Sequence, residues 1–224
     1  MASKLLDDKT KEQVKEFFSE LEKPVKIIFF GSTKENCEYC EETIGLLCEI
    51  EELNELIKLE EYDIDKHKET ATTYNIDKVP MTVIAGMDGD NIIDYGIRLS
   101  GIPAGHEFTT LINDIVMVSK GDSGLTSEIR EKLSELKEPV NLQVFVTPTC
   151  PYCPQAVILA HQMAIESELV SGEMVEAMEF AELSNQYNVS GVPHTIINSG
   201  AGEVVGAVPE ARLMDEIEKA LSNN

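Results

Sequence analysis

Two pairs of cysteines in this chain have the spacing of a dithiol that can close into a disulfide and open again. Cys37 and Cys40 form one pair and Cys150 and Cys153 the other, with two residues between the cysteines in each. Each pair follows a short apolar run and precedes a helical pattern, which places its first cysteine at a helix N-terminus. Unpaired amide N–H groups and the helix dipole stabilise a thiolate there, and the thiolate is the form that attacks disulfides. Both pairs therefore predict thiol–disulfide exchange.

A Val-Pro dipeptide follows each cysteine pair by about 40 residues, directly before a predicted strand. The proline removes a backbone donor and, in the cis form, would turn neighbouring backbone groups toward the cysteines. A tyrosine inside each pair is a second kind of candidate, because it would either form a rim that contacts substrate or simply pack. The candidate substrate-contact residues are therefore Val79, Pro80, Val192, Pro193, Tyr39 and Tyr152.

The second half of the sequence repeats the first with an offset of 113 residues, the separation of Cys37 from Cys150. Tyr74-Asn75-Ile76 returns at the same offset as Tyr187-Asn188-Val189, and both Val-Pro dipeptides share it. Such self-similarity indicates a duplicated unit of roughly 110 residues, with insertions and deletions mostly in loops.

The polar, glycine-containing stretch 120–124 reads as the connector between the two copies, so we expect domains at 1–119 and 120–224. Each copy has the pattern helix, strand, helix, strand, helix, strand, strand, helix. An early strand–helix–strand crossover followed by a late hairpin predicts an α/β fold, with a central mixed four-stranded sheet flanked by helices in each copy.

Hydrophobic periodicity gives the elements of the first copy. The first helix has its apolar side at Val14, Phe17, Phe18 and Leu21 and is expected to end before Pro24. Strands are expected at 25–30, 59–64, 81–84 and 91–98, and further helices from Cys40, at 66–74 and at 105–118.

The composition argues against two classes of partner. The chain has 41 acidic and 18 basic residues, a formal net charge of −23, which disfavours binding to nucleic acid or to an anionic membrane. No stretch approaches the roughly 20 apolar residues of a membrane span. The first eight residues lack the apolar segment of a secretory signal, so we expect a cytoplasmic protein.

Taken together, the cysteine pairs, the Val-Pro dipeptides and the element order resemble the thioredoxin fold family, and Cys-Pro-Tyr-Cys at 150–153 resembles the glutaredoxins. The tandem form is similar, over the whole chain, to the protein disulfide oxidoreductases of archaea and thermophilic bacteria. This resemblance implies that both pairs form redox-active disulfides and that Pro80 and Pro193 are cis. It implies reduction, oxidation or isomerisation of protein disulfides, as in protein disulfide isomerase. It also implies no bound cofactor, with electrons arriving from NADPH through a thioredoxin reductase.

One feature of thioredoxins is missing. Thioredoxins carry a buried acid on the strand before the cysteines, which helps the second thiol lose its proton. Neither 25–30 nor 140–146 contains Asp or Glu. Another group would have to move that proton, and the sequence does not name it.

Other readings of the cysteines are a shared four-cysteine zinc site, inert disulfides and, for the fifth cysteine, a third redox role. The 109 residues between the pairs exceed the usual spacing of a zinc site, and the four histidines share no metal-like spacing, so we expect no metal site. His194, next to Pro193, would either line the site or serve as a strand residue. Cys48, on the apolar side of its helix, is expected to be a buried core thiol, with a redox partnership to Cys40 as the alternative.

The two pairs differ in their charged surroundings. Acidic side chains surround the first pair, with only Lys34 to oppose them, whereas none lies near the second. Carboxylates disfavour a nearby thiolate, so we predict a lower thiol pKa for Cys150 than for Cys37 and make Cys150 the main nucleophile. The acids near the first pair are Glu35, Glu38, Glu41 and Glu42.

The function predicted from the sequence is therefore a protein disulfide oxidoreductase that works through both pairs, with Cys150 and Cys153 dominant. Its expected partners are protein disulfides and a thioredoxin reductase, and a peroxidase is a further candidate. The alternatives are a dedicated electron carrier to a peroxidase and a client-binding chaperone module in which redox activity is secondary.

Overall fold

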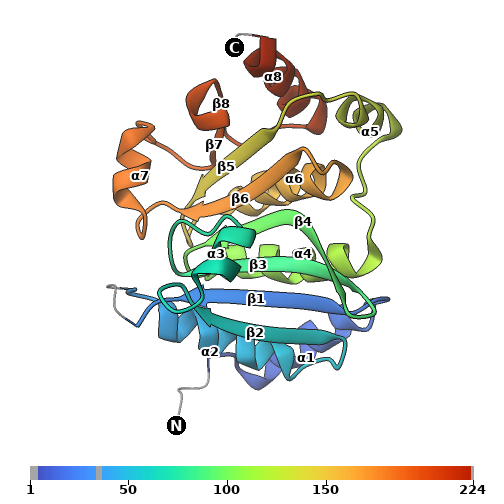
Figure 1. Cartoon of the computed structure of the whole chain (residues 1–224), viewed down its shortest axis with the longest axis vertical. Helices are drawn as coiled ribbons and strands as arrows, with labels where there is room; N and C mark the ends of the chain where they lie inside the picture. Colours follow the sequence, from blue (N-terminus) through green and yellow to red (C-terminus); the bar gives the residue numbers. More distant parts are fainter. Residues whose placement is uncertain (1–4, 34–36, 223–224) are drawn as a thin grey trace.

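One mixed sheet of eight strands runs through both halves of the chain (Figure 1). The computed structural model describes residues 5–33 and 37–222. The strand order is β2-β1-β3-β4-β6-β5-β7-β8, so the first four strands along the sheet come from the first half and the last four from the second.

The two halves contain the same α-helices and strands in the same order, as the repeat predicted, and the second half adds one short 3-10 turn. The first half contains α1 (Asp8–Phe18), β1 (Val25–Gly31), α2 (Cys40–Glu51), β2 (Ile57–Asp63), α3 (Lys68–Thr73), β3 (Met81–Asp88), β4 (Asn91–Ser100) and α4 (Glu107–Lys120). The second half contains α5 (Ser127–Ser134), β5 (Val140–Val146), α6 (Cys153–Glu166), β6 (Val170–Glu176), α7 (Ala181–Gln186), β7 (His194–Ile197), the short 3-10 turn η1 (Asn198–Gly200), β8 (Gly202–Val205) and α8 (Glu210–Ser222).

The first helix is shorter than predicted. It ends at Phe18, and the Ser19 hydroxyl donates to the Glu16 carbonyl at 2.6 Å where the helix stops. Val14 and Phe18 are buried, whereas Phe17 is 54% exposed. The buried positions are four residues apart and define the inner face of α1, and Phe17 falls outside it.

Within each half the pairing is that of a mixed sheet. β1 is parallel to β2 and antiparallel to β3, and β3 is antiparallel to β4. The second half repeats this with β5, β6, β7 and β8. The halves join where β4 pairs with β6 in parallel, Ile97 to Ser100 opposite Gly172 to Val175. The two four-stranded sheets thus form one sheet. Each half contributes an edge strand, and the unpaired backbone N–H and C=O groups of the two strands form hydrogen bonds with each other.

Alternate residues of the strands feed cores on opposite faces of the sheet. On β1, Ile27 and Phe29 enter a large cluster that runs through both halves, beneath α1, α2, α4, α5, α6 and α8. Ile28 and Phe30 point to the other face, into a small cluster under α3. Phe145 belongs to a matching cluster under α7. In Figure 1, α2, α4 and α6 lie behind the sheet and α3 lies in front of it.

A buried carboxylate joins the two halves on the face that carries α3 and α7. Glu173 of β6 accepts from Lys78 Nζ at 2.7 Å, from Ser100 Oγ at 2.6 Å and from Gln143 Nε2 at 2.9 Å. Lys78 and Ser100 belong to the first half and Gln143 to the second. The side chain of Glu173 is 9% exposed and that of Lys78 is 15% exposed, so both charges are largely withdrawn from water and depend on each other.

Loss of this carboxylate should therefore weaken the junction. We expect Glu173→Ala to lower the free energy of unfolding by about 3 kcal/mol, because it leaves Lys78 with Asp77 as its one carboxylate partner among the described residues and removes the acceptor of two further donors. Urea denaturation measures the loss. The control is Lys219→Ala, which removes a lysine whose side chain is 58% exposed in its pair with Glu216 and should change stability by less than about 0.5 kcal/mol. Equal losses in the two variants would contradict a structural role for Glu173.

Candidate redox sites

Both cysteine pairs are closed as disulfides at the same edge of the sheet. The Cys37–Cys40 bond follows β1 and the Cys150–Cys153 bond follows β5. The Cα atoms are 5.4 Å apart in the first pair and 5.5 Å in the second, within the usual span of a disulfide. The helices α2 and α6 begin at the second cysteine, so each first cysteine lies in the turn just before the helix. It remains within one turn of the N-terminus, where the helix dipole acts.

The Val-Pro dipeptides stand at this same edge. The peptide bonds before Pro80 and Pro193 are both cis, as expected. Pro80 precedes β3 and Pro193 precedes β7, and these strands pair antiparallel with β1 and β5. The starts of β3 and β7 therefore meet the ends of β1 and β5, which brings each proline to the edge that carries its cysteine pair. Both prolines are buried, and Val79 and Val192 are half-buried.

The second disulfide is more enclosed than the first. Cys150 is 8% exposed and Cys153 is 0% exposed, whereas Cys37 and Cys40 are half-buried. The first pair borders an open cavity of about 540 Å³ whose lining includes five acidic residues, Glu38, Glu41, Glu42, Glu61 and Asp63. On its inner side this pair lies close to the end of β1, because a Cβ at Gly31 would come within 3.1 Å of Cys40 Sγ.

The acidic surroundings expected for the first pair are present in the described residues. Glu41 and Glu42 occupy the first turn of α2, while the first turn of α6 has no acid and has a proline in its place. The nearby Glu38 carboxylate raises the pKa of the Tyr39 hydroxyl. Lys34 and Glu35 lie outside the described residues.

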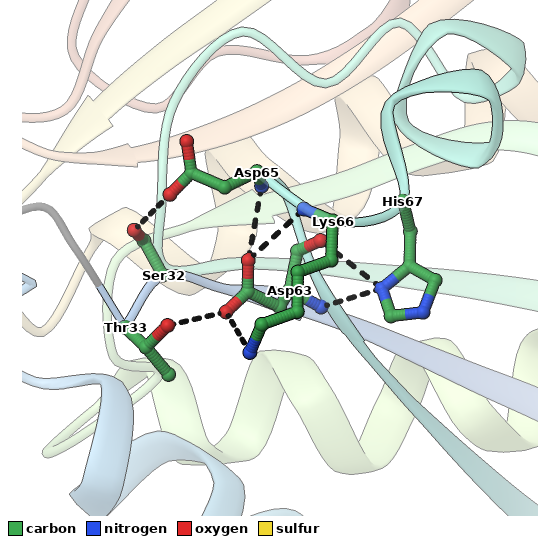
Figure 2. Close-up of polar contacts among 6 residues, drawn as sticks. All are labelled: Ser32, Thr33, Asp63, Asp65, Lys66 and His67. Carbon is green, nitrogen blue, oxygen red and sulfur yellow. Dashed lines mark hydrogen bonds and ion pairs between the residues drawn. The ribbon is translucent and has the colours of Figure 1, made fainter.

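A polar cluster ties the two residues that follow β1, Ser32 and Thr33, to the end of β2 and the turn after it (Figure 2). Asp63 accepts from Thr33 Oγ1 at 2.6 Å, from the amides of Asp65 and Lys66, and from Lys66 Nζ at 3.0 Å. Ser32 Oγ donates to Asp65 at 3.0 Å. The Thr33 hydroxyl and the Lys66 ammonium hold the pKa of Asp63 well below its usual range, so this carboxylate is ionised and ties the ends of β1 and β2 together.

The second copy has a related turn with different chemistry. Glu176 stands where Asp63 does and accepts from the amides of Met178 and Glu179 at 3.0 and 2.6 Å. Burial raises the pKa of Glu176. Burial also raises the pKa of Glu179 to about 7, and the negative charges of Glu176 and Glu38 act in the same direction. Glu179 also accepts from the Ile102 amide at 2.7 Å. This turn therefore lies against the first half, within electrostatic reach of the first cysteine pair.

A buried acid of the first half begins the helix that packs against the turn before Cys150. Glu107, the first residue of α4, is 1% exposed, and its Oε1 has no hydrogen-bond partner among the described residues. The preceding amide, of His106, donates to the Pro148 carbonyl at 3.0 Å. Gly105 has a positive φ of 61°, and a Cβ there would collide with that same carbonyl. The start of α4 is thus packed against the turn that leads to Cys150.

Burial raises the pKa of Glu107 to about 7. Its Oε2 accepts from the Thr110 hydroxyl at 2.6 Å, which partly offsets the burial. The sequence pattern did not single out this residue, because an acid was expected only on the strand before each cysteine pair. The sequence did contain a signal for it. Glu107 has the helical spacing of Leu111, Ile115 and Val118, so this acid lies on the apolar face of its helix.

The geometry rules out one zinc ion shared by the four cysteines. Three strands, β3, β4 and β6, stand between β1 and β5, so the pairs lie about 19 Å apart at the usual strand spacing. A zinc–sulfur bond is about 2.3 Å long. No cluster of metal-binding side chains occurs in the part of the chain that the structure describes.

The expectation for Cys48 was wrong. Its side chain is exposed and carries a free thiol. The buried residues of α2 are Thr43, Leu46, Leu47 and Ile50, a face that leaves position 48 to solvent. Partial burial and the nearby Glu51 and Glu61 raise the pKa of this thiol.

The remaining candidates divide between surface and core. Tyr152 is 68% exposed beside the second pair, and Tyr39 is half-buried. His194 is a buried residue of β7 whose Nε2 lies 3.2 Å from Glu203. Within residues 5–33 and 37–222, no helix is long and apolar enough to cross a membrane.

Two disulfides that each link a strand end to a helix start, each with its own cis-proline, define a thiol–disulfide oxidoreductase built from thioredoxin folds. A thioredoxin domain model matches residues 140–219. The structure of a protein disulfide oxidoreductase from Aeropyrum pernix K1 superposes with a TM-score of 0.88 at 31% identity, covering 98% of this chain and 96% of that one. The chain belongs to the protein disulfide oxidoreductase family.

A second group of relatives is named for peroxide metabolism. The alkylhydroperoxide reductase AhpF of Enterococcus faecalis aligns with a TM-score of 0.85 at 25% identity, over 96% of this chain and 100% of that one. An alkyl hydroperoxide reductase protein of Pseudomonas aeruginosa is 23% identical over 202 residues, 90% of this chain. The chain spans 35% of the length of that relative.

The exposure of Cys48 has a direct chemical consequence. In the oxidised protein we expect a maleimide or iodoacetamide to label one thiol per chain, and Cys48→Ser to abolish the labelling. Because the thiol pKa is raised, labelling near neutral pH should be slower than for free cysteine and should accelerate as pH rises. Mass spectrometry of the labelled chain reads the outcome, and labelling at a motif cysteine instead would contradict the assignment.

Proposed function

We propose that the chain catalyses thiol–disulfide exchange on protein substrates, with Cys150 as its principal nucleophile. The observation that carries this proposal is the asymmetry of the two sites. The second pair has no acid in the first turn of its helix, and the start of α4, with the buried Glu107 as its first residue, packs against the turn before Cys150. The first pair borders an acidic cavity instead. Fewer nearby carboxylates favour the Cys150 thiolate.

The proposed reaction is a two-step reduction of a substrate disulfide. The Cys150 thiolate attacks one substrate sulfur, a mixed disulfide forms, and the other substrate sulfur leaves as a thiolate that takes a proton from water. Cys153 then loses its proton and attacks Cys150 Sγ, which releases the second substrate thiol and closes the Cys150–Cys153 disulfide. Two electrons pass to the substrate, and the steps reversed oxidise a dithiol.

Glu107 is our candidate for the group that accepts the proton of Cys153. A general base works best when its pKa lies near the operating pH, and the pKa of Glu107 is about 7. Its free Oε1 leaves a lone pair for that proton. In the reverse direction the protonated carboxyl returns the proton to the departing Cys153 sulfur. The chemistry needs no bound cofactor, because the electrons stay on sulfur.

Around this site we assign substrate contact to Tyr152, Val192 and Pro193, with Tyr39, Val79 and Pro80 in the corresponding places of the first site. A cavity of about 360 Å³ joins Thr147, at the start of the turn before Cys150, to Val192, and Tyr152 is exposed beside the cysteine pair. A side chain of a substrate would lie here, beside the turn that leads to Cys150.

The wider setting is part of the same proposal. We assign 1–119 and 120–224 as the two domains, a cytoplasmic location, and re-reduction by NADPH through a thioredoxin reductase. The relatives named as alkyl hydroperoxide reductases support a second candidate function, delivery of electrons to a peroxidase. Both candidate functions use the same thiol–disulfide exchange, and they differ in the protein that carries the substrate disulfide.

Single-site variants test the assignment of the nucleophile. We expect Cys150→Ser to lower the rate of insulin reduction at least about tenfold, and Cys37→Ser to lower it less, because the Cys150 thiolate is the more populated at neutral pH. Thiolate absorbance against pH in each background gives the two thiol pKa values. A lower pKa at Cys37, or a larger loss of activity in Cys37→Ser, would reverse the assignment.

Removal of the buried acid tests the proton step. We expect Glu107→Gln to slow the closure of the mixed disulfide by Cys153 about 100-fold, a typical contribution of a positioned base, while alkylation of Cys150 keeps its rate. A chromogenic mixed disulfide on Cys150 reports the closure directly. Glu210→Gln, at the start of α8 in the second half, is the matched control and should leave closure unchanged. Normal closure in Glu107→Gln would remove Glu107 from the mechanism.

A further inference from the structure

Large apolar side chains are exposed at few places in the described part of the chain, and three of them lie around the second cysteine pair. Tyr152, Met178 and Val205 are 68%, 76% and 66% exposed. The other exposed large apolar residues belong to the N-terminal segment, to α1 and to the start of β4 at the opposite edge of the sheet: Leu5, Phe17, Ile92 and Ile93. Exposed apolar side chains that gather beside a reactive group indicate a contact surface.

Met178 lies beside the turn that leads to Cys150. The Ala177 amide donates to the carbonyl of Val146, the last residue of β5, at 2.9 Å. Ala177 and Thr147 line the same cavity, and the Cys150 amide donates to the Thr147 carbonyl at 3.1 Å. The chain at Met178 therefore runs about one strand spacing, roughly 5 Å, from the turn that carries the nucleophile.

The backbone of Met178 is fixed by its neighbours. Glu176 accepts from the amides of Met178 and Glu179 at 3.0 and 2.6 Å, and Glu179 accepts from the Ile102 amide at 2.7 Å. An exposed side chain on a fixed turn loses less conformational freedom when it contacts a partner than one on a mobile loop.

Val205 lies on the other side of the second pair. It is the register partner of His194, the residue after Pro193, and the Gly206 amide donates to the Pro193 carbonyl at 2.7 Å. In the sheet, β6 is the neighbour of β5 on one side and β7 on the other. Met178, which follows β6, and Val205, opposite the start of β7, therefore flank the cysteine pair.

The span of this surface matches a short extended polypeptide. Three strand spacings separate β6 from β8, a distance of about 14 Å. An extended chain covers that distance with about four or five residues. A substrate segment that crosses the strand ends with its cysteine over β5 therefore brings the side chains on both sides of that cysteine to Met178 and Val205.

The first copy has a charged residue in place of Met178. The Ile64 amide donates to the Gly31 carbonyl at 2.9 Å, as the Ala177 amide does to the last residue of β5, so Asp65 is the counterpart of Met178. A carboxylate loses its hydration when an apolar group covers it. This position of the first copy therefore does not favour an apolar substrate.

The counterpart of Val205 in the first copy is buried. Ser100 is the register partner of Met81, the residue after Pro80, as Val205 is of His194. Ser100 is fully buried and lies against β6, whereas β8 is the last strand of the sheet and leaves Val205 uncovered. The joining of the two halves thus removes from the first site a surface position that the second site retains.

We propose that Tyr152, Met178 and Val205 form an apolar contact surface by which the second pair selects extended segments of protein substrates with apolar side chains on both sides of the reacting cysteine. The occupant is a polypeptide, because exchange brings the substrate's own cysteine to Cys150 Sγ and its sequence neighbours to this surface. The first turn of α6 has no acid, although the chain has a net charge of −23, so an apolar segment is favoured there over a basic one. This inference rests on the proposed exchange between Cys150 and protein disulfides.

Two peptides test the surface. Each has a central cysteine in a mixed disulfide with thionitrobenzoate, and the three residues on either side are leucine in one peptide and serine in the other. The Cys150 thiolate attacks the peptide sulfur, and thionitrobenzoate leaves as its coloured thiolate. Cys153 then loses its proton, attacks Cys150 Sγ and releases the peptide thiol. The measurement is the second-order rate constant of thionitrobenzoate release by the reduced full chain.

Two backgrounds isolate the two cysteine pairs. The second pair is alone in the variant Cys37→Ser, Cys40→Ser, Cys48→Ser, and the first pair in the variant Cys48→Ser, Cys150→Ser, Cys153→Ser. We expect the second pair to react at least about tenfold faster with the leucine peptide than with the serine peptide, as partial burial of two apolar side chains would give. The first pair should show a preference of less than about threefold, because its corresponding positions are Asp65 and the buried Ser100.

Substitutions in the second-pair background locate the preference. Met178→Gln and Val205→Thr should each lower the ratio of the two rate constants about threefold, and Met178→Leu should retain it, because the contact needs an apolar side chain and not methionine itself. Ile92→Thr is the matched control, an exposed apolar position at the opposite edge, and should leave the ratio unchanged. A ratio that survives the double variant Met178→Gln, Val205→Thr would overturn the proposal.

The same rates separate this inference from the function on which it rests. If the second pair reacts with both peptides at equal rates, exchange at Cys150 holds and only the apolar surface is wrong. If it reacts with neither peptide, the proposed function fails and the surface fails with it.

Discussion

The parallel pairing of β4 with β6 is the contact on which the other features of this molecule depend. It joins Ile97–Ser100 to Gly172–Val175 through backbone hydrogen bonds and so makes one sheet from two copies of the same unit. Because strand ends line up along a sheet edge, the pairing brings both disulfides to the same edge. It also packs α4 of the first half against α6 of the second, the helix that begins at Cys153.

Duplication produced two similar sequences but two different sites, because each copy has different neighbours. The second pair follows β5, the third strand from the β8 end of the sheet, with α4 against its helix, and its Cys153 is fully buried. The first pair lies near the other end of the sheet, beside β2, and opens to an acidic cavity. At Asp63 and Glu176 the copies even keep the same turn, yet one carboxylate is stabilised by donors and the other is destabilised by burial. The difference between the two sites arises from this packing.

Buried ionisable groups gather where the halves meet. Glu173 binds Lys78 on one face of the sheet, and Asp114 binds His161 on the other. Withdrawing charges from water costs several kcal/mol per ion unless each finds a partner, and here the partners come from opposite halves. These polar contacts are directional and therefore favour one relative arrangement of the two units. Apolar packing alone is less directional and would restrict that arrangement less.

The sequence by itself determined the element order, the duplication, both redox pairs and the prolines beside them, because these follow from local spacing and periodicity. It placed Cys48 and Phe17 on the buried faces of their helices, and the structure exposes both. Successive residues of a helix differ in direction by only about 100°, so spacing alone does not decide whether a residue at the margin of the apolar face is buried. Only the tertiary structure decided that the two sheets are one and that Glu107, Asp114 and His161 share a layer. These are contacts between elements far apart in the chain, and no local pattern encodes which strand edges pair or which helix faces meet.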